Sequence, residues 1–463
     1  MKHTIIHRAG SILLFTFFFA VNGHTQNSAI TGSWKGDIRM DHLQLHLVFF
    51  IEQNEDGYSS SMDSPDQLQS GIPIEETQFD SLSGQLQLRS LNLMMTYSGI
   101  LHHDTITGTF MQAGKKSPLT LVRQKRPQDP GKPYPYHSEE VRFDNKEAGI
   151  SLAGTFTYPE TGEKFPAVVL ITGSGAQNRD EELLDHRPFL VLSDYLTRNG
   201  IAVLRYDDRG VYESEGDFIH SDIYDFASDA MAGFDYLKSR RETDPDKIGI
   251  IGHSEGGTIS FMLAGEHPEI AFIVSMAGGA VPGDTLLVAQ RYAISKSIGL
   301  SDKAIMENER LVAGLDSIAR RHSFATILQD ADSLVEELIP VKQRKNSPVR
   351  KFYASQLTGI ASPPLRSFLD YDPLDALKKI ECSVLALYGE KDLQVPAGLN
   401  SARLHSLNKP NFTVRIYPEL NHIFQHAKTG HPSEYSSIEE TIAPEVLEDI
   451  VRWIVSVTAR NSR

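Results

Sequence analysis

A glycine-rich pentapeptide directly after a short apolar run is the feature that most constrains how this chain can fold. The run is Ile248-Gly-Ile-Ile251, and the pentapeptide Gly252-His-Ser-Glu-Gly256 has the pattern G-x-S-x-G. A strand that turns sharply into a helix through this pattern lifts one serine hydroxyl clear of the backbone. Glycine suits such a turn because the backbone is strained and its neighbours approach closely. The pattern therefore predicts that Ser254 is a nucleophile at the end of a strand.

The segments around the pentapeptide predict an α/β fold with a doubly wound, mostly parallel sheet. Short runs that are apolar throughout are typical of strands covered by helices on both faces. Such runs alternate with amphipathic helical stretches over 187–198 and 222–238, and this alternation is typical of a parallel sheet. The apolar runs are Val168–Ile171, Val203–Leu204, Ile248–Ile251, Phe272–Val274 and Val384–Leu387. We expect this domain to span residues 139–463.

A long insertion interrupts the alternation at about 280–364. It contains helical patterns without a convincing strand, and Ser301 is a plausible start of one helix. An insertion of this length is uncommon as plain loop. We interpret it as a helical cap over the carboxyl end of the sheet, where ligands bind in such folds. The alternative is a helical outgrowth elsewhere on the surface.

The segment before the sheet predicts a second, smaller domain that is all-β. Residues 26–125 show period-2 alternation, as in Leu43, Leu45 and Leu47, with turn residues between the runs. A small barrel or sandwich is expected, with Trp34 in its core or plugging one end of a barrel. Adjacent His102 and His103 would point to opposite faces of a strand, which disfavours a metal site. Four prolines make residues 126–138 a stiff linker.

Residues 1–25 have the features of a secretory signal peptide. Lys2 and Arg8 precede the apolar run from Ser11 to Val21, and small residues follow it. The run is short for a membrane span, so an uncleaved anchor is the weaker alternative. We therefore expect a secreted or periplasmic protein without a membrane span after signal removal. The only cysteine, Cys382, excludes an intrachain disulfide.

Charge narrows the class of partner. The chain has 463 residues and a formal net charge of −15. An acidic balance disfavours nucleic acid, because binding phosphates needs a basic face. A small-molecule or carbohydrate substrate is expected, and the oligomeric state is left open.

A nucleophilic serine needs a base within reach and an acid that orients the base. In a doubly wound hydrolase the chain order is nucleophile, acid, base. Asp392 and His422 each follow a predicted strand and satisfy that order. Both should therefore lie at the same edge of the sheet as the nucleophile. Competing candidates are the acids Glu390 and Asp372 and the base His426.

Stabilising the oxyanion of the transition state requires hydrogen-bond donors. The first expected donor is the backbone N–H of Glu255, and the second should come from the glycine-rich loop over 173–180. Ser174 is the preferred residue, with Gly175 next, and the alternative is that the loop is only a tight turn. His253 should point away from Ser254 and pack or hold a loop. This chemistry needs no metal and no organic cofactor.

With these motifs the sequence resembles the α/β-hydrolase superfamily over about residues 140–462, the cap excepted. Arg205-Tyr-Asp-Asp-Arg-Gly-Val-Tyr-Glu-Ser-Glu-Gly216 is similar to a D-x-R-G-x-G-x-S-x-G stretch common there, with Tyr212 at a position that is usually glycine. Residues 252–257 and 419–424 resemble bacterial two-domain esterases with a small N-terminal β domain. The same core resembles serine aminopeptidase-like and acyl-peptidase hydrolases.

The resemblance implies cleavage of short-chain carboxylic esters through a Ser-His-Asp triad and an acyl-enzyme, with acetylated carbohydrates among the candidate substrates. One alternative is a serine peptidase or aminopeptidase of the same fold. Peptidases of the prolyl-oligopeptidase type carry a β-propeller, for which about a hundred residues are too few. The other alternative is a non-catalytic surface-binding protein, which the three candidate residues argue against.

Overall fold

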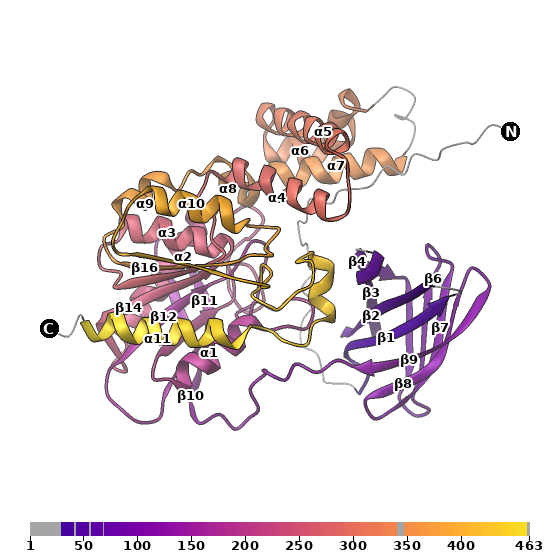
Figure 1. Cartoon of the computed structure of the whole chain (residues 1–463), viewed down its shortest axis with the longest axis horizontal. Coiled ribbons are helices and arrows are strands. Elements are labelled where there is room, and N and C mark those ends of the chain that lie inside the picture. Colours follow the sequence, from indigo (N-terminus) through magenta and orange to yellow (C-terminus); the bar gives the residue numbers. More distant parts are fainter. Residues whose placement is uncertain (1–28, 41–42, 55–56, 68, 340–346, 461–463) are drawn as a thin grey trace.

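The computed structural model describes residues 29–40, 43–54, 57–67, 69–339 and 347–460. Two separate sheets organise it, one before and one after the proline-rich segment (Figure 1). The predicted fold class is confirmed. The predicted signal peptide lies outside the described residues. None of the described helices is both long enough and apolar enough to cross a membrane.

The first sheet has nine antiparallel strands in the order β4-β3-β2-β1-β9-β8-β7-β6-β5. It curls until β3 lies beside β5, where the Ser60 and Thr77 hydroxyls are 2.6 Å apart. The sheet is therefore nearly closed, like a barrel. Trp34 is fully buried in its core, and its indole N–H donates to the carbonyl of Ile30. The strands are β1 (Gly32–Met40), β2 (Leu43–Asn54), β3 (Gly57–Ser64), β4 (Gln69–Ile74), β5 (Glu76–Asp80), β6 (Gln85–Ser90), β7 (Met95–His102), β8 (Thr105–Gln112) and β9 (Lys115–Arg123), with the short helix η1 (Pro65–Gln67).

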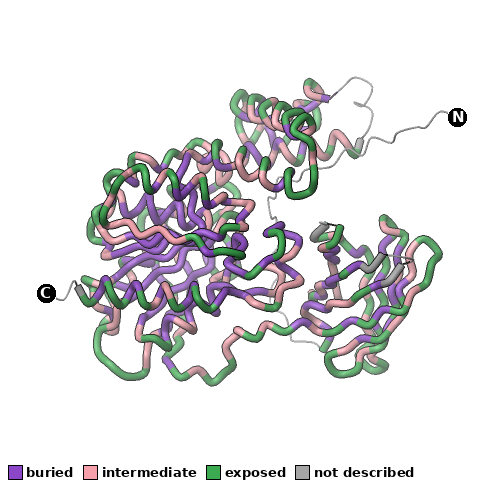
Figure 2. Tube along the Cα trace, in the orientation of Figure 1, coloured by how far each residue is buried: buried purple, intermediate pink, exposed green. Residues whose placement is uncertain are grey.

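The second sheet has eight strands in the order β10-β11-β13-β12-β14-β15-β16-β17. Pairing is antiparallel between β10, β11 and β13 and parallel from β13 to β17. Strands β13 and β15 are buried along their whole length, and β12 and β14 are buried over their apolar runs, as those runs predict (Figure 2). The strands are β10 (Tyr136–Asn145), β11 (Ile150–Pro159), β12 (Phe165–Ile171), β13 (Ala202–Tyr206), β14 (Thr243–His253), β15 (Phe272–Met276), β16 (Ser383–Gly389) and β17 (Phe412–Tyr417).

Helices cover both faces of the second sheet. Helices α1 and α11 lie on one face, and α2, α3 and α9 lie on the other (Figure 1). The predicted helical stretches correspond to α1 and α2, and the Asp222 side chain caps α2 by accepting the N–H groups of Tyr224 and Asp225. The helices are α1 (Pro188–Arg198), α2 (Ile223–Ser239), α3 (Glu255–Glu266), α9 (Leu374–Lys379), α10 (Ala397–Ser406) and α11 (Pro444–Arg460), with the short helix η3 (Pro432–Ser437).

The insertion between β15 and β16 is helical throughout its described residues, as expected. Helices α5, α6 and α7 share an apolar core of their own, which includes Leu315, Ile327 and Leu357. Phe324 of α6 contacts His220, which lies in the loop after the carboxyl end of β13. The insertion therefore meets the carboxyl edge of the sheet. Its elements are α4 (Gly283–Ser297), α5 (Asp302–Arg321), α6 (Phe324–Leu334), η2 (Val335–Glu337), α7 (Ser347–Ala361) and α8 (Pro363–Asp370).

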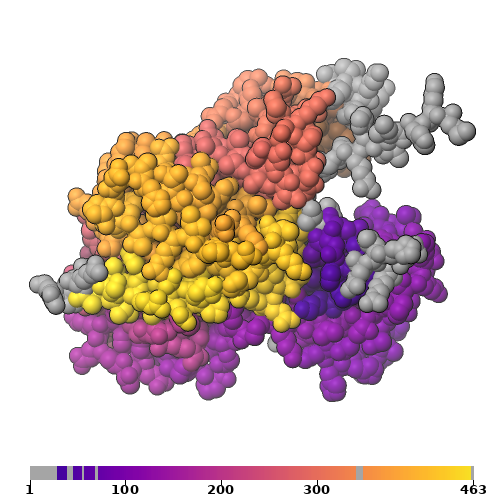
Figure 3. Space-filling model, in the orientation of Figure 1, coloured from indigo at the N-terminus to yellow at the C-terminus, as the bar shows by residue number. Residues whose placement is uncertain are grey.

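The chain that joins the sheets is hydrogen-bonded to segments outside the strands in the domain that contains the second sheet. Arg126 donates to the carbonyls of Ile438 (2.8 Å) and Leu184 (2.9 Å). On either side of it, the Gln124 amide donates to Ser436 O and the Gln128 amide to Ile442 O. Figure 3 shows the resulting contact between the first sheet and the C-terminal part of the chain. The linker is therefore docked along its first residues.

Candidate active site

Ser254 lies in the turn between β14 and α3 with a left-handed backbone, at φ 53° and ψ −115°. This conformation is strained for a residue other than glycine. The flanking glycines allow it: a Cβ on Gly252 would lie 2.0 Å from Gly256 O, and one on Gly256 would lie 2.2 Å from Ile171 O. The Ser254 N–H donates to Met276 O at 2.8 Å. The two glycines of the G-x-S-x-G pattern are thus required because the backbone packs too closely around Ser254 to leave room for a side chain at either position.

Asp392 and His422 follow β16 and β17, and the structure brings their side chains together. His422 Nδ1 donates to Asp392 Oδ2 at 2.8 Å. Both residues are almost fully buried, with 3% and 5% of their surface exposed. The second carboxylate oxygen of Asp392 accepts the N–H groups of Gln394 and Val395, both at 2.8 Å. The aspartate is therefore fixed in place and orients the histidine ring.

No hydrogen bond joins the Ser254 hydroxyl to His422 in the described part of the chain. The two residues are linked through His253, whose ring centroid lies 4.9 Å from that of His422. Hydrogen bonds of catalytic groups are often long without substrate and tighten in the complex. The geometry therefore supplies an oriented base next to the serine turn.

The glycine-rich loop after β12 packs against the serine. A Cβ on Gly173 would lie 3.3 Å from Cβ of Ser254. The Gly173 N–H is already used, since it donates to Glu181 Oε1 at 2.7 Å. Among the described residues, the N–H groups of Ser174, Gly175 and Glu255 have no hydrogen-bond acceptor. These three groups are the ones expected from the sequence as oxyanion donors.

Asp208, in the stretch 205–216 that resembles the superfamily motif, holds the same loop in place by hydrogen bonds. Its two oxygens accept the Thr172 hydroxyl at 2.8 Å and the Gln177 N–H at 2.9 Å. Burial raises the pKa of this carboxyl well above its ordinary value. Tyr212, which occupies a usual glycine position, has φ 48° and a half-exposed ring. It thus adopts a backbone conformation that glycine would take without strain.

A second histidine–carboxylate pair lies beside the first, and the sequence did not indicate its acid, Glu181. His253 Nδ1 donates to Glu181 Oε1 at 2.9 Å, and His253 Nε2 donates to the carbonyl of His422 at 3.1 Å. Burial alone would lower the pKa of His253, but the charge and hydrogen bond of Glu181 outweigh it and raise this pKa. His253 therefore holds two loops, as expected, and both ring nitrogens are occupied.

The competing candidates are all more exposed than Asp392 and His422. Glu390 and Asp372 are exposed. His426 is half-exposed and pairs with Glu440 at 2.9 Å and with Glu445. No group of three or more histidine, cysteine, aspartate or glutamate side chains among the described residues could hold a metal ion.

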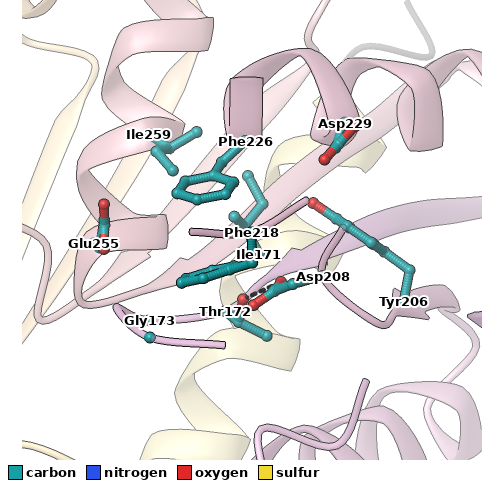
Figure 4. Close-up of a pocket in the computed structure, with 11 residues that line it drawn as sticks. Ile171, Thr172, Gly173, Tyr206, Asp208, Phe218, Phe226, Asp229, Glu255 and Ile259 are labelled. Atoms are coloured by element: carbon teal, nitrogen blue, oxygen red, sulfur yellow. Dashed lines mark hydrogen bonds between the residues drawn. The ribbon is translucent and has the colours of Figure 1, made fainter. Parts of the chain in front are cut away.

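A pocket opens beside the serine turn (Figure 4). Its walls come from the loop after β12, the carboxyl end of β13 and the facing sides of α2 and α3. The Phe218 and Phe226 rings stack in it, with centroids 5.1 Å apart. The lining residues are Ile171, Thr172, Gly173, Gly175, Tyr206, Asp208, Phe218, Phe226, Asp229, Glu255 and Ile259.

Comparisons with known proteins found relatives both by sequence and among solved structures. Esterase EstD of Thermotoga maritima is 24% identical over 327 residues, which cover 69% of this chain and 70% of that protein. Among solved structures, hypothetical protein PA2218 from Pseudomonas aeruginosa aligns over 72% of this chain and 98% of its own, with 16% identity and a TM-score of 0.46. Est1E from Butyrivibrio proteoclasticus aligns over 69% and 99%, with 18% identity and a TM-score of 0.41.

A family profile gives the clearest assignment. The profile described as X-Pro dipeptidyl-peptidase (S15 family) matches residues 148–411. The matched segment includes Ser254 and Asp392 and ends before His422. The expected resemblance to α/β hydrolases is confirmed, and the prediction of an enzyme that hydrolyses carboxylic esters is supported by the esterase relative. Because the match spans more than half of the chain, this protein belongs to the X-Pro dipeptidyl-peptidase (S15) family of α/β hydrolases.

Proposed function

We propose that this protein is a secreted serine esterase that uses Ser254 as nucleophile, His422 as base and Asp392 as orienting acid. The observation that carries the proposal is the 2.8 Å hydrogen bond between Asp392 and His422 at the sheet edge where β14 delivers Ser254. A carboxylate so placed holds the imidazole in one tautomer and stabilises the imidazolium that forms. The named esterase relative favours an ester as the substrate.

The proposed reaction has two halves. Ser254 Oγ attacks the ester carbonyl while its proton passes to His422 Nε2, and the oxyanion accepts hydrogen bonds from the N–H of Glu255 and of Ser174 or Gly175. The ester C–O bond then breaks, and the alcohol leaves with the proton from His422. Water attacks the acyl-enzyme with His422 as base, which releases the acid and restores Ser254.

We further propose that the substrates are short-chain acyl esters, including acetylated carbohydrates, and that residues 1–25 direct secretion. The charged start and apolar run of that segment support export. Acyl chain length is tested with p-nitrophenyl esters from acetate to octanoate and with an acetylated xylan. Export is tested by comparing the N-terminus of the mature protein with that of the full chain. An intact N-terminus would contradict the export proposal.

The nucleophile is tested with the Ser254→Ala variant. We expect wild type to hydrolyse p-nitrophenyl acetate and to be labelled by a fluorophosphonate, and the variant to do neither while keeping its circular dichroism spectrum. Ser239→Ala is the matched control, since this serine is exposed and its hydroxyl donates to Tyr236 O within its own helix, so its loss should change neither activity nor labelling. Labelled or active Ser254→Ala would refute the proposal.

A peptidase is the second candidate, favoured by the name of the matching family. It would use the same three residues but cleave an amide. An X-Pro p-nitroanilide, such as Ala-Pro-p-nitroanilide, separates the two. We expect kcat/KM for p-nitrophenyl acetate to exceed that for the anilide. The reverse order would promote the peptidase.

A further inference from the structure

One carboxyl in the pocket beside Ser254 has no partner. Glu255, the first residue of α3, is 7% exposed. Its Oε1 is inaccessible to solvent and has no hydrogen-bond partner among the described residues. In the described part of the chain neither of its oxygens takes part in a hydrogen bond or an ion pair. A buried carboxyl in this state is costly unless another group pairs with it.

The other two carboxyls of the pocket are already satisfied. Asp208 accepts the Thr172 hydroxyl and the Gln177 N–H. Asp229 is ion-paired with Arg209 at 2.7 Å and accepts from the Asn145 amide at 2.7 Å. The unpaired Glu255 is therefore a specific feature of the pocket and not a consequence of a generally acidic wall.

The position of Glu255 relates its carboxyl to the reacting carbonyl. Its backbone N–H is the expected oxyanion donor, and its side chain lines the pocket opposite Gly173 (Figure 4). Gly175 of the same loop also lines the pocket. Since the N–H and the carboxyl belong to one residue, a ligand group that meets the carboxyl lies within about one side-chain length of the expected oxyanion donor.

The surroundings favour a neutral partner. The pocket-lining residues include no lysine, arginine or histidine, and the stacked rings of Phe218 and Phe226 make part of its wall apolar. A carboxyl that is desolvated in this way favours its uncharged form, and burial raises the pKa of Glu255 to about 7. An uncharged carboxyl both donates and accepts, which suits a hydroxyl group.

We propose that the Glu255 carboxyl is a specificity site for an acyl group that carries a hydroxyl close to the ester carbonyl, so that among short-chain acyl esters those of hydroxy acids are hydrolysed faster than those of unsubstituted acids such as acetate. This inference rests on the proposed esterase function. A site built to bond a substrate hydroxyl rejects the analogue that lacks it, because its own polar group is then left unpaired.

The test compares benzyl lactate with benzyl propanoate, which differ by one hydroxyl. Each kcat/KM of the full-length protein is divided by the hydroxide-catalysed rate of the same ester, which removes the difference in intrinsic reactivity. We expect wild type to prefer the lactate by about tenfold or more. In Glu255→Met the preference should fall to near one, whereas Glu255→Gln, an uncharged isostere that can bond a hydroxyl, should keep most of it.

The outcomes separate this inference from the proposed function. If wild type hydrolyses neither of these esters nor p-nitrophenyl acetate, the esterase proposal fails, whereas activity on p-nitrophenyl acetate alone overturns only the specificity site. Equal rates on both esters overturn only the specificity site, and so does a preference that survives in Glu255→Met. A third ester, alanine benzyl ester, tests for an ammonium ligand. A preference for it over the lactate that is lost in Glu255→Gln would show an ionised carboxylate and overturn the proposal.

Discussion

Two histidine–carboxylate pairs lie side by side at the edge of the second sheet, and they differ in whether both ring nitrogens of the histidine are hydrogen-bonded. In the Asp392–His422 pair, Nδ1 is bonded to the acid, and Nε2 has no hydrogen-bond partner among the described residues. In the Glu181–His253 pair, one nitrogen is bonded to the acid and the other to a carbonyl. The same residue types therefore form a proton carrier in one place and a brace in the other.

The comparison predicts that the first pair is the more sensitive to loss of its acid. In Asp392→Asn we expect kcat to fall by about 10³–10⁴-fold, because the amide favours the wrong tautomer of His422. Steady-state kinetics on p-nitrophenyl acetate measures the change, with the melting temperature as a check on folding. A loss below about tenfold would mean that the orienting acid is another residue.

Glu255 differs from the acids of both pairs because its buried carboxyl has no histidine partner among the described residues. Its pKa is raised by burial from 4.5 to about 7, so between these values the unfolded chain has lost the proton that the folded chain keeps. The free energy of unfolding must then decrease by ~3 kcal/mol as the pH rises through this window, and it levels off above the window. Urea unfolding of wild type and Glu255→Gln at pH 5 and pH 8 isolates this contribution. Identical pH dependence in the two proteins would rule it out.

Loss of the acid in the second pair should weaken activity without abolishing it. Glu181 accepts the N–H of Gly173 as well as that of His253, so it holds the loop that carries the expected oxyanion donors. We expect kcat to fall by roughly 10- to 100-fold in Glu181→Leu, through misplacement of that loop. Glu181→Gln keeps an acceptor and should lose less. A kcat unchanged in both variants would show that the brace has no part in turnover.

A third pair should be nearly silent. His426 and Glu440 are 2.9 Å apart, but the histidine is half-exposed, and such surface pairs contribute at most about 1 kcal/mol. We expect His426→Gln to change kcat/KM by less than about twofold. A large loss would return His426 to the candidates for the base.

The sequence alone indicated much of this arrangement, because its strongest signals are local. The apolar runs located the buried strands, and the glycines around Ser254 located the turn. Asp392 and His422 were identifiable because each follows a strand, and parallel strands bring their carboxyl ends to one edge. The sequence did not decide whether the first sheet forms a barrel or a sandwich, because the curling of the sheet depends on contacts between distant strands, such as that of Ser60 with Thr77.

Glu181 could not be found in this way. It lies 72 residues before His253 in the chain, in an acidic run that reads as an ordinary exposed loop. Its burial follows from the packing of three separate loops, and no periodicity records that packing. The unpartnered state of the Glu255 carboxyl could not be predicted either, because the sequence shows that a glutamate is present but not which groups surround its side chain.

The docked linker has a consequence for how this protein can be divided. Arg126 is bonded to Leu184, three residues after Glu181, and to Ile438, in the segment that follows the His422 loop. Both loops that meet at His253 are thus anchored to a residue that lies outside the second sheet. A fragment that begins at Tyr136, where that sheet starts, would keep the candidate catalytic residues but lose these anchors. The smallest unit that carries the complete site therefore begins before Arg126.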